Sequence, residues 1–355
     1  MKKLTMILFA ALLLVGILAG CVAENSGSSD SGGDAEAGGE SEGESVQAGG
    51  EDGLDIAVVP KLVGIPYFNA SESGAIEAGE DLEVNVNYTG PTQADASAQV
   101  KVIEDLISKN VDVIAVAPND PASVEPVLKK AKEQGIHVMD WDTPADKELV
   151  DLSVKQVDDE EFGRHMAKKL VEAMGTEEGE IAILTGGLSA ANLNLWIEAA
   201  QKEFDENYPG IEIVSEKIPT EEKQQVAYQK TLDLLKSYPD LKGVLAVSTP
   251  APLGAAQAVQ EEGLQDEVSV VGSALPTDSA PFLEDGSLDT AVLWDPGKLG
   301  YLTVALGKML AEGEMPEDGQ EIEGVGEITV KEDGKTVIMG PPADFTKENA
   351  ADFDF

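Results

Sequence analysis

The sequence predicts an α/β protein built from two doubly wound parallel-sheet domains joined by a hinge. Three observations support this prediction. The chain has 355 residues, which is enough for two packed domains. From residue 54 onward, short strand-like runs alternate with helical segments. Most of these runs are continuous stretches of Val, Ile, Leu and Ala, which is typical of parallel strands covered by helices on both faces.

The first residues of the chain indicate export. Residues 1–3 are a short basic region and residues 4–19 are apolar, a pattern typical of a secretory signal rather than of a membrane span, which needs about 20 apolar residues. The sequence Leu18-Ala-Gly-Cys21 resembles the bacterial lipoprotein box. The resemblance implies removal of residues 1–20 and lipid modification of Cys21. An ordinary signal peptide with an incidental cysteine is the alternative.

A linker is expected next. Residues 22–53 are mostly Gly, Ser, Ala, Glu and Asp, with no aromatic and no basic residue. Such a segment cannot bury enough apolar surface to become ordered. We therefore expect residues 21–53 to be a lipidated cysteine followed by a disordered acidic Gly/Ser linker. The predicted location is extracytoplasmic, in the cell envelope or periplasm, anchored to the cell membrane only through the lipid.

The charge of the chain limits its partners. Against 24 Lys and Arg there are 67 Asp and Glu, a formal net charge of −43. A surface this acidic repels nucleic acid and anionic lipid headgroups, so no nucleic-acid partner is expected. Arg164 is the only arginine, so bidentate clamps for phosphate or carboxylate are nearly unavailable.

The expected strands follow one another at intervals that leave room for helices between them. The predicted strands are Ile56–Val59, Glu83–Tyr88, Val111–Ala117, Ile136–Asp140, Ile181–Thr185, Ile211–Ile218, Val244–Ser248, Val268–Gly272 and Asp289–Trp294.

The order of these runs predicts two lobes, with connections near residues 150–157 and 273–277. Residues 54–155 with about 275–322 are expected to form an N-terminal lobe, residues 156–274 with about 323–340 a C-terminal lobe, and residues 341–355 a C-terminal tail.

The loop after the first strand is the clearest candidate for ligand binding. Ile56–Val59 is a short, buried-type strand, and the prolines and glycine of residues 60–66 end it. The loop carries one cation, Lys61, and two adjacent aromatic residues, Tyr67 and Phe68. In open α/β sheets, ligands bind outside the carboxyl ends of the strands, which is where this loop should lie.

Tryptophan and polar residues at other strand ends favour a sugar. The three tryptophans, Trp141, Trp196 and Trp294, all fall at or shortly after the end of a predicted strand, and two occur as Trp-Asp. A sugar needs hydrogen bonds to its hydroxyls and a flat face against its C–H groups. The alternative is that each tryptophan is a core residue with a polar handle. Further candidate ligand-binding residues at these ends are Asp142, Asn192, Ser248, Thr249, Ser273 and Asp295.

Several segments resemble a known family. They are residues 60–68 (PKLVGIPYF), 90–92 (GPT), 141–142 (WD), 293–295 (LWD) and 347–355 (KENAADFDF). Residues 54–355 resemble the type I periplasmic sugar-binding proteins of ABC importers, in the branch that binds autoinducer-2 or rhamnose. The resemblance implies the periplasmic-binding-protein type I fold. It also implies that Lys61 and Asp142 contact the ligand and that Tyr67 or Phe68 stacks on it.

The second lobe departs from the autoinducer-2 pattern. Those binders have an Asp-Gln pair where this chain has Asn192-Leu193, and their Pro-x-Ala matches Val247-Ser-Thr249 only loosely. The ligand could therefore be autoinducer-2 or a neutral sugar such as a pentose or a deoxyhexose.

Other chemistries find little support. With one cysteine and two histidines, a zinc site is not expected, and no cofactor-binding or nucleophile-elbow motif is present. We therefore expect a monomeric solute-binding lipoprotein with no catalytic residues, which delivers a small sugar to an ABC transporter permease. A lipid-anchored sugar-active enzyme, or a sugar or autoinducer sensor that feeds a signalling receptor, is the alternative.

Overall fold

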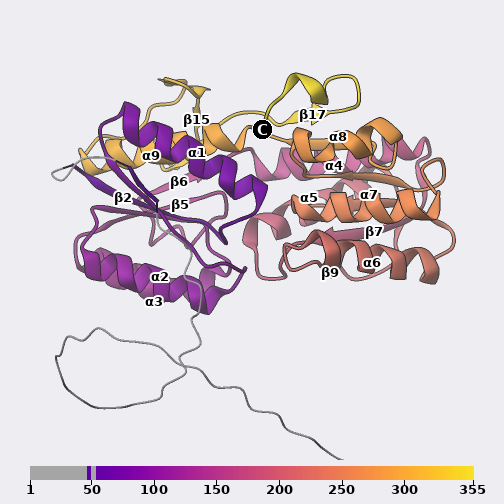
Figure 1. Cartoon of the computed structure of the whole chain (residues 1–355), viewed down its shortest axis with the longest axis horizontal. Helices are drawn as coiled ribbons and strands as arrows, with labels where there is room; N and C mark the ends of the chain where they lie inside the picture. Colours follow the sequence, from indigo (N-terminus) through magenta and orange to yellow (C-terminus); the bar gives the residue numbers. More distant parts are fainter. Residues whose placement is uncertain (1–45, 49–52) are drawn as a thin grey trace, which may run out of the picture. The chain divides into compact units, whose positions relative to one another are not determined.

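The structure is a computed structural model, and it describes residues 46–48 and 53–355. The predicted signal peptide, Cys21 and nearly all of the predicted linker lie outside the described residues. The described part contains two large β-sheets, each covered by helices on both faces (Figure 1). The predicted α/β class with two parallel-dominated domains is confirmed.

The first sheet has the order β1-β3-β2-β4-β5-β6-β16-β15. Its five central strands are parallel, β16 extends them in parallel beside β6, and β1 and β15 are antiparallel edges. The bounds are β1 Val46–Ala48, β2 Asp55–Val59, β3 Asn85–Tyr88, β4 Val113–Val116, β5 His137–Trp141, β6 Leu152–Lys155, β15 Thr329–Val330 and β16 Thr336–Ile338.

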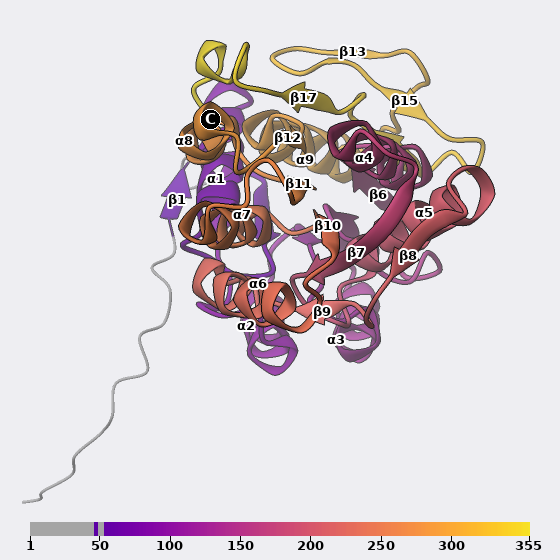
Figure 2. The same cartoon turned by 90° about the vertical axis from the view of Figure 1, so that its right-hand side faces the viewer.

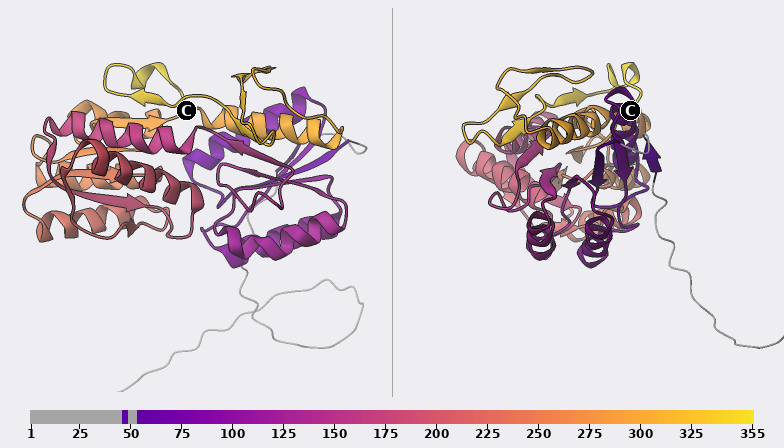
Figure 3. Two further views of the ribbon diagram at one scale, coloured as in Figure 1. Left: turned by 180° about the vertical axis from the view of Figure 1, so that it is seen from behind. Right: turned by 90° about the vertical axis from the view of Figure 1, so that its left-hand side faces the viewer.

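Two pairs of helices cover this sheet. They are α1 (Pro66–Asp81) with α9 (Pro296–Ala311), and α2 (Ala96–Lys109) with α3 (Pro121–Glu133). Figure 3 shows one pair on each face of the sheet. Alternate residues of β2 point to opposite faces of the sheet. Ile56 and Val58 belong to one buried apolar cluster, and Ala57 and Val59 belong to another.

The second sheet has the order β17-β12-β11-β10-β7-β8, and β9 also pairs with β7. All pairs are parallel except β17, which runs antiparallel to β12 at one edge. The bounds are β7 Glu178–Thr185, β8 Gly210–Ile213, β9 Ile218–Pro219, β10 Leu241–Ala246, β11 Ser269–Gly272, β12 Thr290–Leu293 and β17 Ala343–Phe345.

The helices α4 to α8 accompany the second sheet (Figure 2). The helix α4 pairs with α5, α6 pairs with α7, and α8 packs beside α7. Their bounds are α4 Asp159–Met174, α5 Ala191–Asn207, α6 Gln224–Ser237, α7 Pro250–Glu262 and α8 Pro276–Asp285. A small hairpin, β13 (Glu321–Ile322) with β14 (Gly326–Glu327), and a 3-10 turn, Ala350–Asp352, complete the described elements.

Each of the nine predicted runs contains a strand, but several short strands were missed. The predicted run 211–218 holds two short strands, β8 and β9, and β6, β16 and β17 were not predicted at all. Residues 46–48, expected to belong to the disordered linker, form β1 beside β3. These missed strands are only three or four residues long. Their hydrogen-bonding partners come from distant parts of the chain, so local sequence gives little sign of them.

The predicted lobe boundaries need correction at two places. The chain remains in the second sheet through β12, because residue 271 of β11 pairs with residue 290. It crosses at residues 294–295 rather than near 273–277. Residues 336–338 belong to the first sheet, because β16 pairs in parallel with β6. The chain therefore passes between the sheets three times, at residues 156–158, 294–295 and 339–342.

Glycines allow three helix pairs to approach closely. A Cβ atom built at Gly74 of α1 would lie 1.9 Å from the carbonyl oxygen of Gly297 in α9. One built at Gly163 of α4 would lie 2.2 Å from the carbonyl oxygen of Trp196 in α5, and one at Gly254 of α7 would lie 2.3 Å from that of Gln224 in α6. These distances are too short for any side chain, so the helix spacing in both lobes depends on glycine.

Candidate ligand-binding site

A pocket lies where loops at the carboxyl ends of strands from both sheets meet. It encloses about 350 Å³ of space between protein atoms, part of it open to solvent. The lining residues are Lys61, Ile65, Tyr67, Phe68, Asp142, Asn192, Leu193, Trp196, Glu222, Val247, Ser248, Thr249, Ser273, Leu293 and Trp294.

Asp142 is the centre of the polar contacts in the pocket. It follows the last residue of β5, is 4% exposed, and has a positive φ of 58°, a conformation that Asp tolerates better than most residues. The Tyr67 hydroxyl donates to Oδ1 at 2.7 Å, and the Thr143 hydroxyl donates to Oδ2 at 2.9 Å. Its carboxylate is therefore fixed in place and surrounded by donors.

Lys61 and Asn192 connect Asp142 with the second lobe. The Lys61 ammonium lies 3.3 Å from Asp142 Oδ2 and donates to Asn192 Oδ1 at 2.9 Å. The Asn192 amide nitrogen faces the same Asp142 oxygen at 3.4 Å. Asn192 is in the first turn of α5, whereas Lys61 and Asp142 follow strands of the first sheet. The three side chains thus form a buried polar triangle that spans both lobes.

A buried glutamine holds the Lys61 loop. Gln99 Nε2 donates to the carbonyl oxygens of Pro60 and Ala117 at 2.9 and 2.8 Å. Its Oε1 accepts from the Asn119 backbone N–H at 2.9 Å, and Asn119 Nδ2 donates to the Lys61 carbonyl at 2.7 Å. The loops after β2 and β4 are therefore tied together, which fixes the backbone that carries Lys61.

Aromatic rings form the apolar wall. Trp294 lies at a crossing segment and meets Tyr67 edge to face, with centroids 6.0 Å apart, and its indole N–H donates to the Tyr67 hydroxyl at 3.2 Å. Trp196 packs against Trp294 at 5.8 Å and against Phe162 at 4.8 Å. Burial, with Asp142 nearby, raises the pKa of Tyr67 well above its ordinary value, so its hydroxyl stays a donor at neutral pH.

The pocket brings together most of the residues that the sequence analysis proposed for ligand binding. Nine of the ten candidate residues line the pocket, and the exception is Asp295. Asp295 caps α9 by accepting from the Lys298 backbone N–H at 3.1 Å. Trp141, considered as a sugar-stacking residue, is fully buried against Phe68 and Tyr88 and belongs to the core of the first lobe.

Two lining residues stand out among those that were not candidate ligand-binding residues. Trp196, noted in the sequence only as one of three tryptophans near strand ends, has its indole ring on the pocket wall. Glu222 was not predicted, because it follows a two-residue strand and belongs to no motif. It is 8% exposed, and burial raises the pKa of its carboxyl, an effect that Lys61 opposes and Asp142 adds to.

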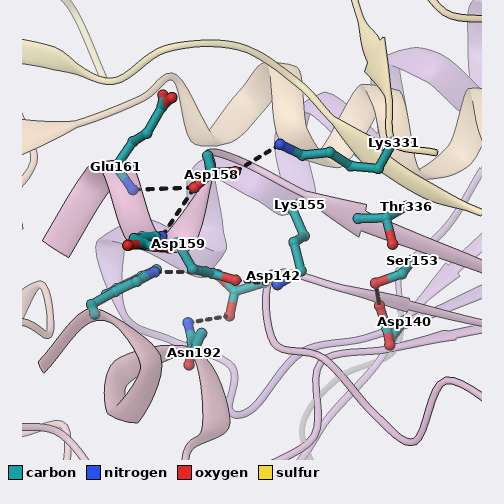
Figure 4. A network of polar contacts seen from close by, with 12 residues as sticks. Asp140, Asp142, Ser153, Lys155, Asp158, Asp159, Glu161, Asn192, Lys331 and Thr336 are labelled. Atoms are coloured by element: carbon teal, nitrogen blue, oxygen red, sulfur yellow. Dashed lines mark hydrogen bonds and ion pairs between the residues drawn. The ribbon is translucent and has the colours of Figure 1, made fainter. Parts of the chain in front are cut away.

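A network of ion pairs surrounds the first crossing (Figure 4). Asp159 pairs with Lys155 across the crossing segment and accepts from the Trp196 indole N–H at 2.8 Å. Asp158 caps α4 and pairs with Lys331, next to β15, at 2.7 Å. The wall of the pocket is thus connected to the segment that joins the lobes.

Each histidine lies beside a single carboxylate. The described part of the chain shows no cluster of three or more His, Cys, Asp or Glu side chains placed to hold a metal. His165 Nε2 lies 2.6 Å from Asp344, and His137 lies 3.9 Å from Asp151. Over the same residues, no helix is both long and apolar enough to span a bilayer.

Two doubly wound lobes with a small pocket at their strand ends define a small-molecule binding protein. Residues 56–315 match the family model described as "Periplasmic binding protein domain", and the chain belongs to that family. The predicted type I sugar-binding class is confirmed, and proteins of this class bind their substrates rather than convert them.

The relatives and solved structures agree with this assignment. The D-allose-binding periplasmic protein of Escherichia coli K12 is 24% identical over 74% of this chain and 88% of its own length. The D-ribose/D-allose-binding protein of Pseudomonas aeruginosa PAO1 is 27% identical over 78% of this chain and 87% of its own length. These proteins are named for the sugars that they bind.

Two solved structures match nearly over their full length. An ABC transporter solute-binding protein of Clostridium phytofermentas with bound L-rhamnose has 26% identity and a TM-score of 0.78, covering 84% of this chain and 98% of that one. LsrB from Clostridium saccharobutylicum in complex with AI-2 has 24% identity and a TM-score of 0.80, covering 85% of this chain and 100% of that one. At 24% identity, the likeness to LsrB supports the fold alone.

Proposed function

We propose that this protein is an extracytoplasmic solute-binding lipoprotein that captures a small neutral sugar and delivers it to an ABC transporter permease. The candidate ligands are a pentose, a deoxyhexose such as rhamnose, or autoinducer-2. The observation that carries the proposal is the buried triangle of Lys61, Asp142 and Asn192 beside the rings of Trp196 and Trp294. Charged and amide groups suit hydroxyls, and flat rings suit the C–H face of a sugar.

The second lobe supplies a further polar group to the pocket. Ser248 is 4% exposed and lies beside the Glu222 carboxylate, which its hydroxyl can reach. A hydroxyl can donate one hydrogen bond and accept others, so Ser248 can also accept from a ligand hydroxyl. This pairing of a hydroxyl with a carboxylate on the pocket wall supports a hydroxyl-rich ligand.

Ligand capture requires the lobes to part. Lys61 and Asn192 come from opposite lobes and meet in the pocket, with the ammonium 2.9 Å from the amide oxygen. A sugar ring can enter the pocket only if contacts such as that between Lys61 and Asn192 open and then re-form around the ring. We infer a hinge motion at the three crossing segments, with the closed form as the one that the permease recognises.

The proposed function predicts selective stabilisation by sugars. Purified protein is titrated with D-ribose, D-allose, D-arabinose, L-rhamnose and autoinducer-2, with thermal unfolding as the measurement. A cognate ligand at 100 times its Kd should add about 2.7 kcal/mol of stability and raise the melting temperature. Calorimetric titration then gives the Kd. If no member of the panel shifts the melting temperature, the proposal of a small neutral sugar is wrong.

The membrane anchor is part of the same proposal and has its own test. With lipidated Cys21, the protein should sediment with membranes after expression in a bacterial host, because the several acyl chains of a lipoprotein hold it durably. The variant Cys21→Ser should appear in the soluble fraction or remain unprocessed. Equal membrane association of the two forms would contradict lipid anchoring while leaving sugar binding untouched.

A further inference from the structure

A second carboxylate reaches the pocket from the second lobe. Glu222 belongs to a turn that is tied to the end of β7. The Thr220 backbone N–H and hydroxyl donate to the Thr185 carbonyl at 2.8 and 3.0 Å, and the Glu221 N–H donates to the Gly186 carbonyl at 2.9 Å. Glu221 and Glu222 both have positive φ, 57° and 53°. Two successive left-handed non-glycine residues are costly, and such strain is concentrated at functional sites.

The end of β7 leaves room for this carboxylate. A Cβ atom at Gly186 would lie 1.9 Å from Glu222 Oε1 and 2.4 Å from its carboxyl carbon. Any other residue at position 186 would therefore push the carboxylate out of its place. The turn and the glycine together hold the Glu222 side chain, 8% exposed, against the pocket.

The charges in the pocket are unequal. Among the described lining residues, Lys61 is the only basic one, and it lies 3.3 Å from Asp142. Glu222 thus adds a second carboxylate without a second cation. If both carboxylates are ionised, the lining carries one excess negative charge. Such a lining accepts hydroxyl donors well and repels anions.

We propose that Glu222 is a specificity-determining residue. It accepts a hydrogen bond from a hydroxyl of the bound sugar on the side of the second lobe, and it excludes sugars that carry a carboxylate or a phosphate. This inference rests on the proposed sugar-binding function. It adds a residue and a chemical selection: neutral polyhydroxyl ligands are accepted, and sugar acids and sugar phosphates are rejected.

The test compares Glu222→Gln with Glu221→Gln. Glu221 is the adjacent residue with the same backbone conformation, but its side chain is exposed, so it serves as the matched control. Calorimetric titration uses the panel sugar that binds the wild-type protein most tightly, with D-galacturonate and D-ribose 5-phosphate as anionic probes. Glu222→Gln should weaken the neutral sugar about tenfold, because a neutral amide replaces a charged acceptor. It should also narrow the preference for the neutral sugar over both anions by at least about tenfold.

A second variant keeps the proposal testable if Glu222→Gln fails to fold. Glu222→Asp keeps the charge but withdraws the carboxylate by one methylene, so the neutral sugar should bind more weakly while the anions stay excluded. Wild-type affinities in Glu222→Gln, or unchanged binding of the neutral sugar in Glu222→Asp, would overturn the role of Glu222 alone. No binding of any neutral sugar to the wild-type protein would overturn the proposed function itself.

Discussion

Replacement of Asp142 with asparagine is expected to weaken binding of the cognate sugar by about 10- to 100-fold. A hydrogen bond that involves a charged group contributes about 1.5–3 kcal/mol, and about 1.4 kcal/mol corresponds to a factor of ten in affinity. Asp142 holds the ammonium of Lys61 at 3.3 Å and the hydroxyl of Tyr67 at 2.7 Å. Asparagine tolerates the positive φ of 58° at this position, so the backbone should keep its conformation.

Calorimetric titration with the sugar identified by thermal shift measures this effect. Asp120→Asn is the matched control, because Asp120 caps α3 through the Ala122 backbone N–H at 2.9 Å, and asparagine caps helices about as well as aspartate. The control should bind like the wild-type protein. If Asp142→Asn also binds within twofold of wild type, Asp142 does not organise the binding site, and the role proposed for Lys61 loses its main support.

The sequence was sufficient to predict the first-lobe side of the pocket. Lys61, Tyr67 and Asp142 all follow strands that read clearly as buried and parallel, and the carboxyl ends of parallel strands meet at one edge of the sheet. Proximity in space therefore followed from topology. Asp295 satisfies the same rule but does not line the pocket, because an aspartate at a strand end can equally well cap the next helix, as it does at α9.

The second-lobe side was harder to predict for physical reasons. Glu222 depends on a turn with two left-handed residues and on the absence of a side chain at Gly186, a match between segments more than 30 residues apart. Trp141 and Trp196 also exchange their expected roles. Trp141 ends β5 and Trp196 lies inside α5, and only the packing around Phe68 and Phe162 decides which ring faces the pocket.

The points where the chain crosses between the sheets were also hard to predict from the sequence. Thr290–Leu293 reads as a buried strand, but nothing in its four residues tells whether it pairs with β11 or with a strand of the first sheet. Likewise, β16 has three residues and joins the first sheet only by pairing with β6. The sequence of β6 is itself short and half polar. Pairing partners that are distant in sequence are specified by the completed fold rather than by local pattern.

Replacement of Gly74 with alanine is expected to destabilise the protein by about 1–2 kcal/mol, against the usual trend for helices. Glycine to alanine in a helix interior normally gains up to about 1 kcal/mol. Here the new methyl carbon would lie 1.9 Å from the Gly297 carbonyl oxygen, so α1 must move away from α9, and overpacking of this kind costs about 1–3 kcal/mol. Because α1 carries Tyr67 and Phe68, sugar affinity should fall as well.

Gly307→Ala, in the neighbouring helix α9, is the matched control for Gly74→Ala. Its added methyl carbon would meet Ile56 at 3.4 Å, an ordinary contact distance, so this variant should be neutral or more stable by up to about 1 kcal/mol. Urea unfolding of both variants, followed by tryptophan fluorescence, measures the difference. Opposite signs for the two glycines are the expected result, because the helices and the substitution are alike and only the clearance differs. If Gly74→Ala proves as stable as Gly307→Ala, the close approach of α1 and α9 does not limit the packing of the first lobe, and Tyr67 and Phe68 are held in the pocket by other contacts.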